Sequence, residues 1–258
     1  MKIVVLGSGS IVPTAERFGS GLLLEDRSAK IGVDPGPGFL EKLRSLGMSP
    51  KSVDAFFITH FHLDHVADLS PLLMMWAYDE QGMPSKDKRK LKLVGPQGLS
   101  RLVEVIASEA FPYLSETMGC DRYTFVEEME DGGHLQVEGI RAVAAKVEHF
   151  NGLAYRFETS RCSVVFSGDT IPDEKLVKLA KGCDVLIHEC SFPSEKMVGK
   201  HTSEEQLAQL AAKIRPRILV ATHLYPVWRG LEERIERAVS GIGLEMVVIA
   251  RDMTVIEI

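Results

Sequence analysis

The stretch ITHFHLDH, residues 58–65, constrains the fold of this chain more than any other feature. It places three of the eight histidines and one aspartate within six consecutive positions. A specified H-x-H-x-D-H pattern is expected by chance only on the order of a few times in ten thousand chains of this length. In an extended segment alternate side chains share a face, so His60, His62 and Asp64 can converge on one side. His65 then turns inward where a helix begins. Imidazole and carboxylate groups suit zinc, manganese or iron, and this spacing offers two sets of ligands rather than one.

Other chemically active residues also follow short apolar runs that are typical of buried strands. The runs VDAFFITH, AKVEH and ILVATH end in a histidine, the run VVFSGD ends in an aspartate, and the run VLIHEC carries a glutamate. Sites in α/β folds are built where the carboxyl ends of strands meet the loops. The residues that this pattern places there are His149, Asp169, Glu189 and His223.

The order of strands and helices predicts the layers of the fold. Residues 123–168 are rich in strands separated by Gly or Ser turns, as in a meander, and the chain after them alternates helix and strand. Two strand-rich halves that each carry helices favour an α/β fold with two sheets face to face and helices on the outer faces. We expect a helix over VADLSPLLMMWAY with a break near Pro71, and a capping box formed by Thr202 and Glu205. No repeat or linker divides the chain, so residues 1–258 are predicted to form a single domain.

Composition excludes several classes of protein. Apolar residues at 45% and charged residues at 26% argue against disorder and against a fibrous repeat. A formal net charge of -6 argues against a dedicated nucleic-acid scaffold, although RNA stays open as a partner through a local basic patch. The four cysteines form no C-x-x-C pair, and the start MKIVVLGSGS is too short for a signal peptide. No stretch approaches the roughly 18 apolar residues of a membrane span. We therefore expect a cytoplasmic protein with reduced cysteines and no membrane partner.

On these residues the chain resembles the metallo-β-lactamase superfamily of hydrolases, and within it the RNase Z group of phosphodiesterases. HFHLDH is similar to the superfamily signature, and His149, Asp169 and His223 follow it in the superfamily's order. VDPGPG, with Asp34, resembles the loop that supports the site from beneath. HECSF, HTS and VGPQGL are similar to stretches of the RNase Z group.

The resemblance implies a four-layer αββα sandwich, in which two mixed sheets lie face to face, and two divalent metal ions. Zinc is the first candidate, with manganese or iron as alternatives. The two implied ligand sets share Asp169 as a bridge: His60, His62 and His149 for the first ion, and Asp64, His65 and His223 for the second.

The resemblance also implies catalytic roles in the hydrolysis of a phosphodiester. Asp64 would bind metal and steer the proton of the attacking water. Glu189 and His201 would form a relay in which His201 protonates the leaving alkoxide, a role that needs a pKa near the working pH. The alternative for His201 is an ordinary residue before a helix start. His188 adjoins Glu189, but alternation along a strand points it away, so we expect a structural role for it.

Substrate contacts are predicted in YPVWRG, directly after His223. Tyr225, Trp228 and Arg229 are candidates to reach a phosphate or to stack on a base, and core packing is the alternative for Trp228. Residues 74–92 have an apolar start and a basic end, which predicts either a lid over the site or a solvated loop.

The length of one connection favours a small substrate. The RNase Z group usually carries a flexible arm that clamps transfer RNA, between the ligands that correspond to His149 and Asp169. Here only FNGLAYRFETSRCSVVFSG lies between them, enough for a hairpin. We therefore predict a small, cyclic or nucleotide-derived phosphodiester as the substrate.

Several other functions remain alternatives. They are tRNA 3′-processing, hydrolysis of a thioester, lactone or sulfate ester, an iron-dependent redox protein on the same scaffold, and a non-catalytic metal-stabilised binding module. His62 argues against the di-iron redox protein, because relatives of that type resemble H-x-E-x-D-H. The sequence leaves open whether a homodimer brings a partner loop over the site.

Overall fold

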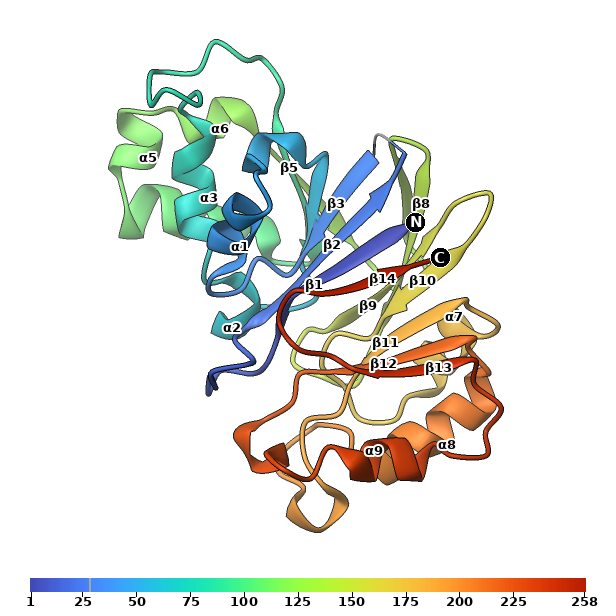
Figure 1. Ribbon diagram of the computed structural model, residues 1–258. Coiled ribbons are helices and arrows are strands. Elements are labelled where there is room, and N and C mark those ends of the chain that lie inside the picture. Colours follow the sequence, from blue (N-terminus) through green and yellow to red (C-terminus); the bar gives the residue numbers. More distant parts are fainter. Residues whose placement is uncertain (28) are drawn as a thin grey trace.

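The computed structural model describes residues 1–27 and 29–258. Two seven-stranded β-sheets pack face to face, and helices cover both outer faces (Figure 1). This is the four-layer αββα arrangement, so the predicted fold class is confirmed.

The first sheet has the strand order β14-β1-β2-β3-β4-β5-β6. Strands β14, β1, β2 and β3 pair antiparallel, whereas β3, β4, β5 and β6 run parallel. The carboxyl ends of the parallel strands therefore meet at one edge of the sheet. The bounds are β1 (Lys2–Ser8), β2 (Ser20–Asp26), β3 (Ala29–Val33), β4 (Ala55–Phe57), β5 (Leu91–Pro96), β6 (Thr124–Met129) and β14 (Thr254–Glu257).

The second sheet has the strand order β13-β12-β11-β10-β9-β8-β7. Strands β7 to β10 form an antiparallel meander, and β10 to β13 run parallel. The meander predicted over residues 123–168 is thus present, except that β6 pairs with β5 in the first sheet. The bounds are β7 (His134–Val137), β8 (Ile140–Lys146), β9 (Leu153–Glu158), β10 (Ser163–Phe166), β11 (Val185–Glu189), β12 (Ile218–Thr222) and β13 (Met246–Ile249).

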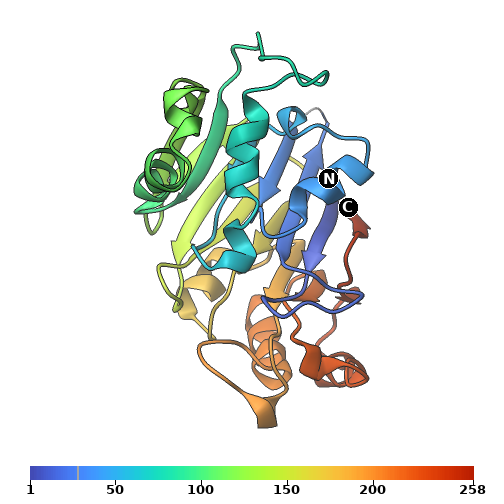
Figure 2. The same cartoon turned by 90° about the vertical axis from the view of Figure 1, so that its left-hand side faces the viewer.

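Helices cover each sheet on the side away from the other sheet. Figure 2 shows α1 and α3 lying across the first sheet, and Figure 1 shows α7, α8 and α9 against the second. Over the first sheet lie α1 (Phe39–Ser45), α2 (Leu63–Val66), α3 (Leu69–Trp76), α4 (Leu99–Glu104), the π-helical turn η2 (Val105–Ala110), α5 (Tyr113–Glu116) and α6 (Cys120–Tyr123). Over the second lie α7 (Glu174–Ala180), α8 (Glu204–Ile214) and α9 (Glu233–Ala238). Single 3₁₀ turns are η1 (Pro50–Ser52), η3 (Ser194–Lys196) and η4 (Pro226–Trp228).

The break predicted near Pro71 falls just before α3. The helix α2 ends at Val66, and Asp68 is the N-cap of α3. Pro71 therefore lies in the first turn of α3. Backbone N–H groups in the first turn make no hydrogen bond within the helix, so a proline costs nothing there.

The capping box of α8 was predicted one residue too early. Ser203 is the N-cap, and its hydroxyl accepts from the N–H of Gln206 while the Gln206 side chain accepts from the N–H of Ser203. Thr202 is instead tied to the neighbouring loops, because its N–H donates to Glu189 Oε2 and its hydroxyl donates to the Thr170 carbonyl. The sequence TSEEQ offers two overlapping capping patterns, and tertiary contacts of Thr202 select the second.

Three apolar clusters hold the layers together, one between the sheets and one beneath each helical layer. The cluster between the sheets joins residues from both ends of the chain, from Met1 to Ile256. Near its centre, the ring of Phe57 at the end of β4 makes edge contacts with Tyr155 and Phe157, at centroid distances of 5.2 and 5.1 Å. These contacts fix the end of β4, from which the chain continues to His60.

Of the two predictions for residues 74–92, a lid over the site or a solvated loop, the contacts favour the loop. Residues 77–90 lead into the amino end of β5, and they contact residues at the amino end of β4: Lys51 Nζ donates to Ser85 Oγ at 2.6 Å, and Arg89 pairs with Asp54 at 3.6 Å. Because β4 and β5 run parallel, this is the opposite edge of the sheet from the one that carries His60. The part of this segment between α3 and β5 is therefore a solvated loop away from the site.

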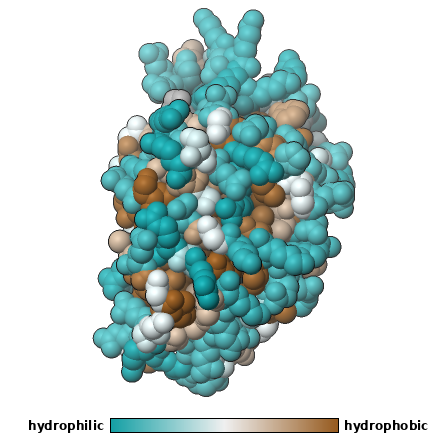
Figure 3. Space-filling model, turned by 90° about the vertical axis from the view of Figure 1, so that its right-hand side faces the viewer, coloured by the Kyte–Doolittle hydropathy of each residue, from teal (hydrophilic) through white to brown (hydrophobic). Residues whose placement is uncertain are grey.

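The described residues include no helix that is long and apolar enough to cross a membrane. The face in Figure 3 is largely hydrophilic, with hydrophobic residues scattered among polar ones.

We expect Phe57→Ala to lower the free energy of unfolding by about 3–5 kcal/mol, because it leaves a cavity between the sheets. Urea unfolding followed by circular dichroism measures the loss. Phe57→Leu should lower the free energy of unfolding by less than Phe57→Ala does, because leucine fills part of the cavity. Phe125→Ala, which removes an aromatic ring that is 46% exposed on β6, should cost less than about 1 kcal/mol. Equal stabilities for Phe57→Ala and Phe125→Ala would contradict this view of the core.

Candidate metal centre

Seven histidine and aspartate side chains converge between the sheets, at the edge where the parallel strands end. They come from the turn after β4, the β8–β9 turn, the loop after β10 and the end of β12. Their ligand atoms form two groups, each within 4.8 Å: a first ligand group of His60, His62, His149 and Asp169, and a second ligand group of Asp64, His65 and His223.

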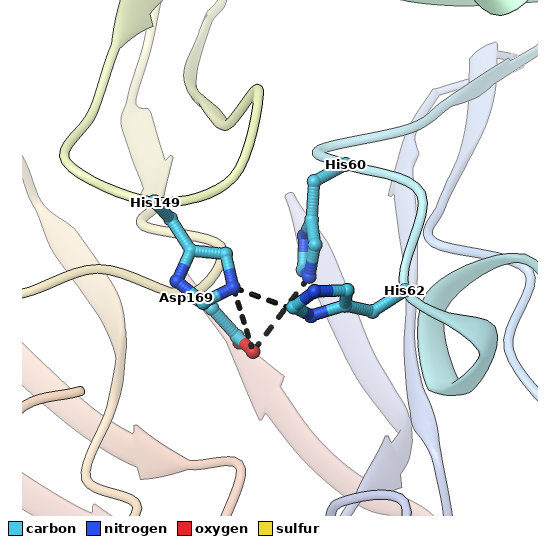
Figure 4. Close-up of side chains that lie close together, drawn as sticks. All are labelled: His60, His62, His149 and Asp169. Carbon is cyan, nitrogen blue, oxygen red and sulfur yellow. Dashed lines mark hydrogen bonds and ion pairs between the residues drawn. The ribbon is translucent and has the colours of Figure 1, made fainter. Parts of the chain in front are cut away.

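The first ligand group is shown in Figure 4, where the four side chains point toward one another. His149 Nε2 lies 3.3 Å from His62 Nδ1, and Asp169 Oδ2 lies 3.8 Å from His60 Nε2 and 4.0 Å from His149 Nε2. Two ligands at about 2.1 Å from a tetrahedral zinc ion lie about 3.4 Å apart. These spacings therefore suit a shared cation.

The second ligand group has similar spacings. His223 Nε2 lies 3.2 Å from Asp64 Oδ2, and His65 Nε2 lies 3.8 Å from the same oxygen. Asp169 reaches this group as well, with Oδ1 at 3.5 Å from His65 Nε2 and Oδ2 at 3.3 Å from His223 Nε2. Asp169 thus faces both groups at once.

The hydrogen bonding of two buried ring nitrogens indicates whether the site fits a metal. Within the described parts of the chain, Nε2 of His60 and Nε2 of His65 have no hydrogen-bond partner. Their Nδ1 atoms are engaged: that of His60 with the Thr59 hydroxyl at 3.0 Å, and that of His65 with Asp34 at 2.7 Å. A buried polar atom without a partner costs about 1–3 kcal/mol. A cation bound by the Nε2 lone pairs would remove this cost, so the residues present fit a metal.

The electrostatics of the cluster also suit a cation. Burial lowers the pKa of His60 well below its usual value, so His60 stays neutral and keeps a lone pair. Burial opposes ionisation of Asp169, but His223 and His65 outweigh it and hold its pKa well below the usual range. Burial also opposes ionisation of Asp64, but a hydrogen bond from His223 outweighs the effect of burial and lowers the pKa of Asp64. Both carboxylates are therefore ionised.

The loop after β3 orients the ligands from below. Asp34, in a left-handed conformation with φ 50°, accepts hydrogen bonds from the Thr59 N–H at 2.7 Å and from the Thr59 hydroxyl at 2.8 Å. It also accepts from Nδ1 of His65, which leaves Nε2 of that ring for a metal. Gly36 lies so close to the Asp64 carbonyl that there is no space for a Cβ atom.

Glu189 and His201 form a pair beside the ligands. Oε1 of Glu189 accepts from Nδ1 of His201 at 3.0 Å and from the Thr170 N–H at 2.7 Å, and Oε2 accepts from the Thr202 N–H at 3.1 Å. Burial disfavours the charged form of His201, but the hydrogen bond and the charge of Glu189 outweigh it and raise its pKa. The His201 ring centroid lies 5.5 Å from that of His149 and 5.6 Å from that of His223.

Ser191 was not singled out from the sequence. Its hydroxyl contacts Glu189 Oε2, Nδ1 of His201 at 3.2 Å and Nδ1 of His223 at 3.0 Å. It therefore links the Glu189–His201 pair to the second ligand group. The available signal was its place in HECSF, two residues after Glu189.

Two histidines lie outside the cluster. His188 is buried, and its Nδ1 contacts the backbone carbonyl of Glu189 at 2.7 Å, which agrees with the expected structural role. His134 is exposed on β7, the outermost strand of the second sheet.

The three predicted substrate contacts have different surroundings. Tyr225 borders the site, with its ring 5.8 Å from that of His223 and stacked on Phe192 at 4.3 Å. Burial and the charges of Asp64 and Asp169 raise the pKa of Tyr225 to about 12. Trp228 is fully buried and donates to the Cys190 carbonyl at 2.7 Å, so it packs in the core and cannot stack on a substrate. Arg229 is exposed on the turn after η4.

Comparison with known proteins supports the same fold and chemistry. The family model of the anti-Pycsar protein Apyc1 matches residues 1–234. A Ribonuclease Z of Mycolicibacterium gilvum (strain PYR-GCK) is 28% identical over 260 residues, covering 93% of this chain and 90% of that protein. The metallo-β-lactamase fold protein YhfI of Bacillus subtilis superposes with a TM-score of 0.82 at 20% identity, covering 98% of this chain and 97% of that one. The short form of human tRNase Z superposes with a TM-score of 0.77 at 19% identity, and the superposition covers 100% of this chain and 99% of that one.

We expect Asp34→Asn to weaken zinc binding by about 10-fold to 100-fold. Both oxygens of Asp34 accept hydrogen bonds, so an amide must turn its NH₂ toward a donor and disturb either Thr59 or His65. Competition with a chromophoric chelator measures the affinity. The matched control is Asp26→Asn, a buried carboxylate that pairs with Arg161. Wild-type affinity in Asp34→Asn would show that Asp34 does not position the ligands.

Proposed function

The chain belongs to the anti-Pycsar protein Apyc1 family, and from this premise we propose a binuclear phosphodiesterase that acts on a small, cyclic or nucleotide-derived phosphodiester. It is a metal-dependent hydrolase of the metallo-β-lactamase fold, similar to Ribonuclease Z. One observation carries the proposal: six ligand side chains surround Asp169 next to the Glu189–His201 pair, and within the described residues the buried Nε2 atoms of two of them, His60 and His65, have no hydrogen-bond partner.

We propose that the two ligand groups each hold one ion, with Asp169 contacting both. The first would be bound by His60, His62 and His149, and the second by Asp64, His65 and His223. Zinc is the first candidate for this mixture of imidazole and carboxylate donors, and manganese and iron are the alternatives. Divalent cations there would supply Lewis acidity, neutralise phosphate charge and activate water.

The residues of the chain itself would then position the reacting groups and move protons. Asp64 would accept a proton from the attacking water. His201, held through Nδ1 by Glu189, would present Nε2 to the leaving alkoxide and protonate it. Ser191, whose hydroxyl contacts both His201 and His223, would hold His201 in a fixed position relative to the second ligand group. Tyr225, with its phenol protonated, would donate a hydrogen bond to a phosphate oxygen.

A small substrate is favoured over transfer RNA by the chain between His149 and Asp169. Residues 150–168 form the β9–β10 hairpin, which pairs within the second sheet. Both of its strands are occupied in sheet pairing, so this connection offers no projecting arm to hold a large RNA. Processing of tRNA 3′ ends, hydrolysis of a thioester, lactone or sulfate ester, and iron-dependent redox chemistry are the competing functions.

We also propose a cytoplasmic location. The support is chemical: the four cysteines are free thiols, and three of them are buried. We also propose that the protein forms a homodimer. Light scattering, which measures the molar mass in solution, tests this.

His201→Ala should distinguish a general acid from a structural histidine. With a cyclic nucleotide, whose leaving group is an alkoxide, we expect turnover to fall by about 100-fold to 10,000-fold. With bis(4-nitrophenyl) phosphate, whose phenolate leaves without protonation, turnover should change little. His134→Ala, at an exposed position on β7, is the control and should keep both activities. Equal losses on both substrates would argue against proton donation by His201.

Removal of metal with a chelator should abolish hydrolysis, and addition of zinc or manganese should restore it. Asp64→Ala should stay inactive after the same treatment, because it lacks both a ligand and the proton acceptor. Rates with cyclic nucleotide, precursor transfer RNA, thioester and lactone give the readout. Full turnover by Asp64→Ala on the best of these substrates would refute the mechanism.

A further inference from the structure

The first ligand group is assembled from both sheets. His60 and His62 follow β4 in the first sheet, whereas His149 lies in the turn between β8 and β9 of the second. Figure 4 shows the His149 side chain facing the other two from a separate part of the chain. Metal–ligand bonds keep their lengths within about 0.2 Å. The group can therefore share one ion only if the His149 turn, residues 147–152, is held firmly against the first sheet.

Three hydrogen bonds tie this turn and β9 to the first sheet, and their donors are alternate residues of the chain. The bonds, at 2.8, 2.9 and 2.7 Å, run from the Tyr155 hydroxyl to the Ile58 carbonyl, from the Leu153 N–H to the Thr59 carbonyl, and from Nδ2 of Asn151 to the Gln97 carbonyl. The Asn151 bond is the one closest to His149 along the chain. It is also the only one of the three that belongs to the turn itself.

The position of Asn151 is passed on to His149 through a tight backbone. The N–H of Gly152 donates to the His149 carbonyl at 3.3 Å, and the N–H of Val147 donates to the Gly152 carbonyl at 3.1 Å. A Cβ atom at position 152 would lie 3.1 Å from the Cβ of His149, so there is little free space inside the turn. What fixes Asn151 therefore also fixes His149.

The Asn151 side chain, rather than packing, joins this end of the turn to the first sheet. A pocket of about 330 Å³, lined by Pro96 and Met129 among others, lies beside the turn. Asn151 is the only asparagine in the chain, and its φ is 50°. Glycine would adopt this left-handed conformation as readily, but it has no side-chain donor for the Gln97 carbonyl.

Resting on the metal centre of the proposed function, we propose that Asn151 is a positioning residue for the first metal ion. Its amide ties the His149 turn to the loop between β5 and α4, and so holds His149 beside His60 and His62 before an ion binds. A site that is already in place binds more tightly, because no free energy goes into fixing the turn. The stretch VGPQGL thereby gains a role, since its Gln97 supplies the acceptor carbonyl.

Asn151→Gly separates the hydrogen bond from the backbone conformation, because glycine keeps the positive φ without strain. We expect the affinity for the first ion to fall by about 2-fold to 10-fold, the effect of one hydrogen bond, and the affinity for the second ion to stay unchanged. Cadmium NMR, during titration against a chelator, resolves the two ions as separate signals. His149→Ala assigns the signal of the first ion by removing it.

The matched control is Glu138→Gly. Glu138 is exposed and has a φ of 45°, in the turn at the opposite end of β8. This variant changes the backbone in the same way but lies away from the ligands, so it should bind both ions as the wild type does.

A second measurement uses the single asparagine and needs no hydrolysis. Isotope labelling of asparagine alone gives one side-chain amide signal, that of Asn151. We expect its protons to exchange with water more slowly than those of a free amide even in the metal-free protein. The signal should shift when the first ion binds and not when the second does.

Unchanged affinity for the first ion in Asn151→Gly would overturn the proposal, and so would an equal loss for both ions, which indicates general destabilisation. If the wild type binds both ions but the labelled amide exchanges like a free one, the positioning role fails and the metal centre stands. If Asn151→Gly loses affinity for the first ion as expected but the wild type hydrolyses no phosphodiester, the proposed function fails and the positioning role stands.

Discussion

Ionised carboxylates buried among imidazole rings are the constraint on which the rest of the structure depends. Asp64 and Asp169 are 5% and 3% exposed, yet nearby histidines keep both charged. Buried charges are tolerated only when they are paired or coordinate a metal. The Nε2 atoms of His60 and His65, which have no hydrogen-bond partner among the described residues, point to the second of these solutions. The two sheets, the Asp34 loop and the Gly36 contact all hold these groups at separations that a cation would bridge.

The sequence predicted the parts of the site that depend on local spacing. H-x-H-x-D-H and the histidines and acids at strand ends could be placed because parallel strands bring their carboxyl ends to one edge, whatever the details of packing. The four layers followed from the alternation of helices and strands. The position of Ser191 between Glu189, His201 and His223 could not be predicted, because it depends on how β11, α8 and β12 pack.

The errors have the same origin. The sequence places strand β6 in the meander, whereas the structure pairs it with β5 in the first sheet. Periodicity identifies a strand but does not show which of the two sheets the strand joins. For residues 74–92 the sequence left both a lid and a solvated loop open, and the parallel direction of β4 and β5, which places this loop at the far edge, decides for the solvated loop. Trp228 follows His223 closely in sequence, yet the 3₁₀ turn η4 directs its indole into the core, where it donates to Cys190.

Anomalous diffraction at the zinc edge, from crystals grown with zinc, tests the central claim most directly. We expect two peaks: one bonded to Nε2 of His60 and the other to Nε2 of His65, each at about 2.0–2.1 Å, with Asp169 in contact with both. An absence of anomalous density between these rings, or a single ion bound elsewhere on the surface, would contradict a binuclear metal centre in this fold.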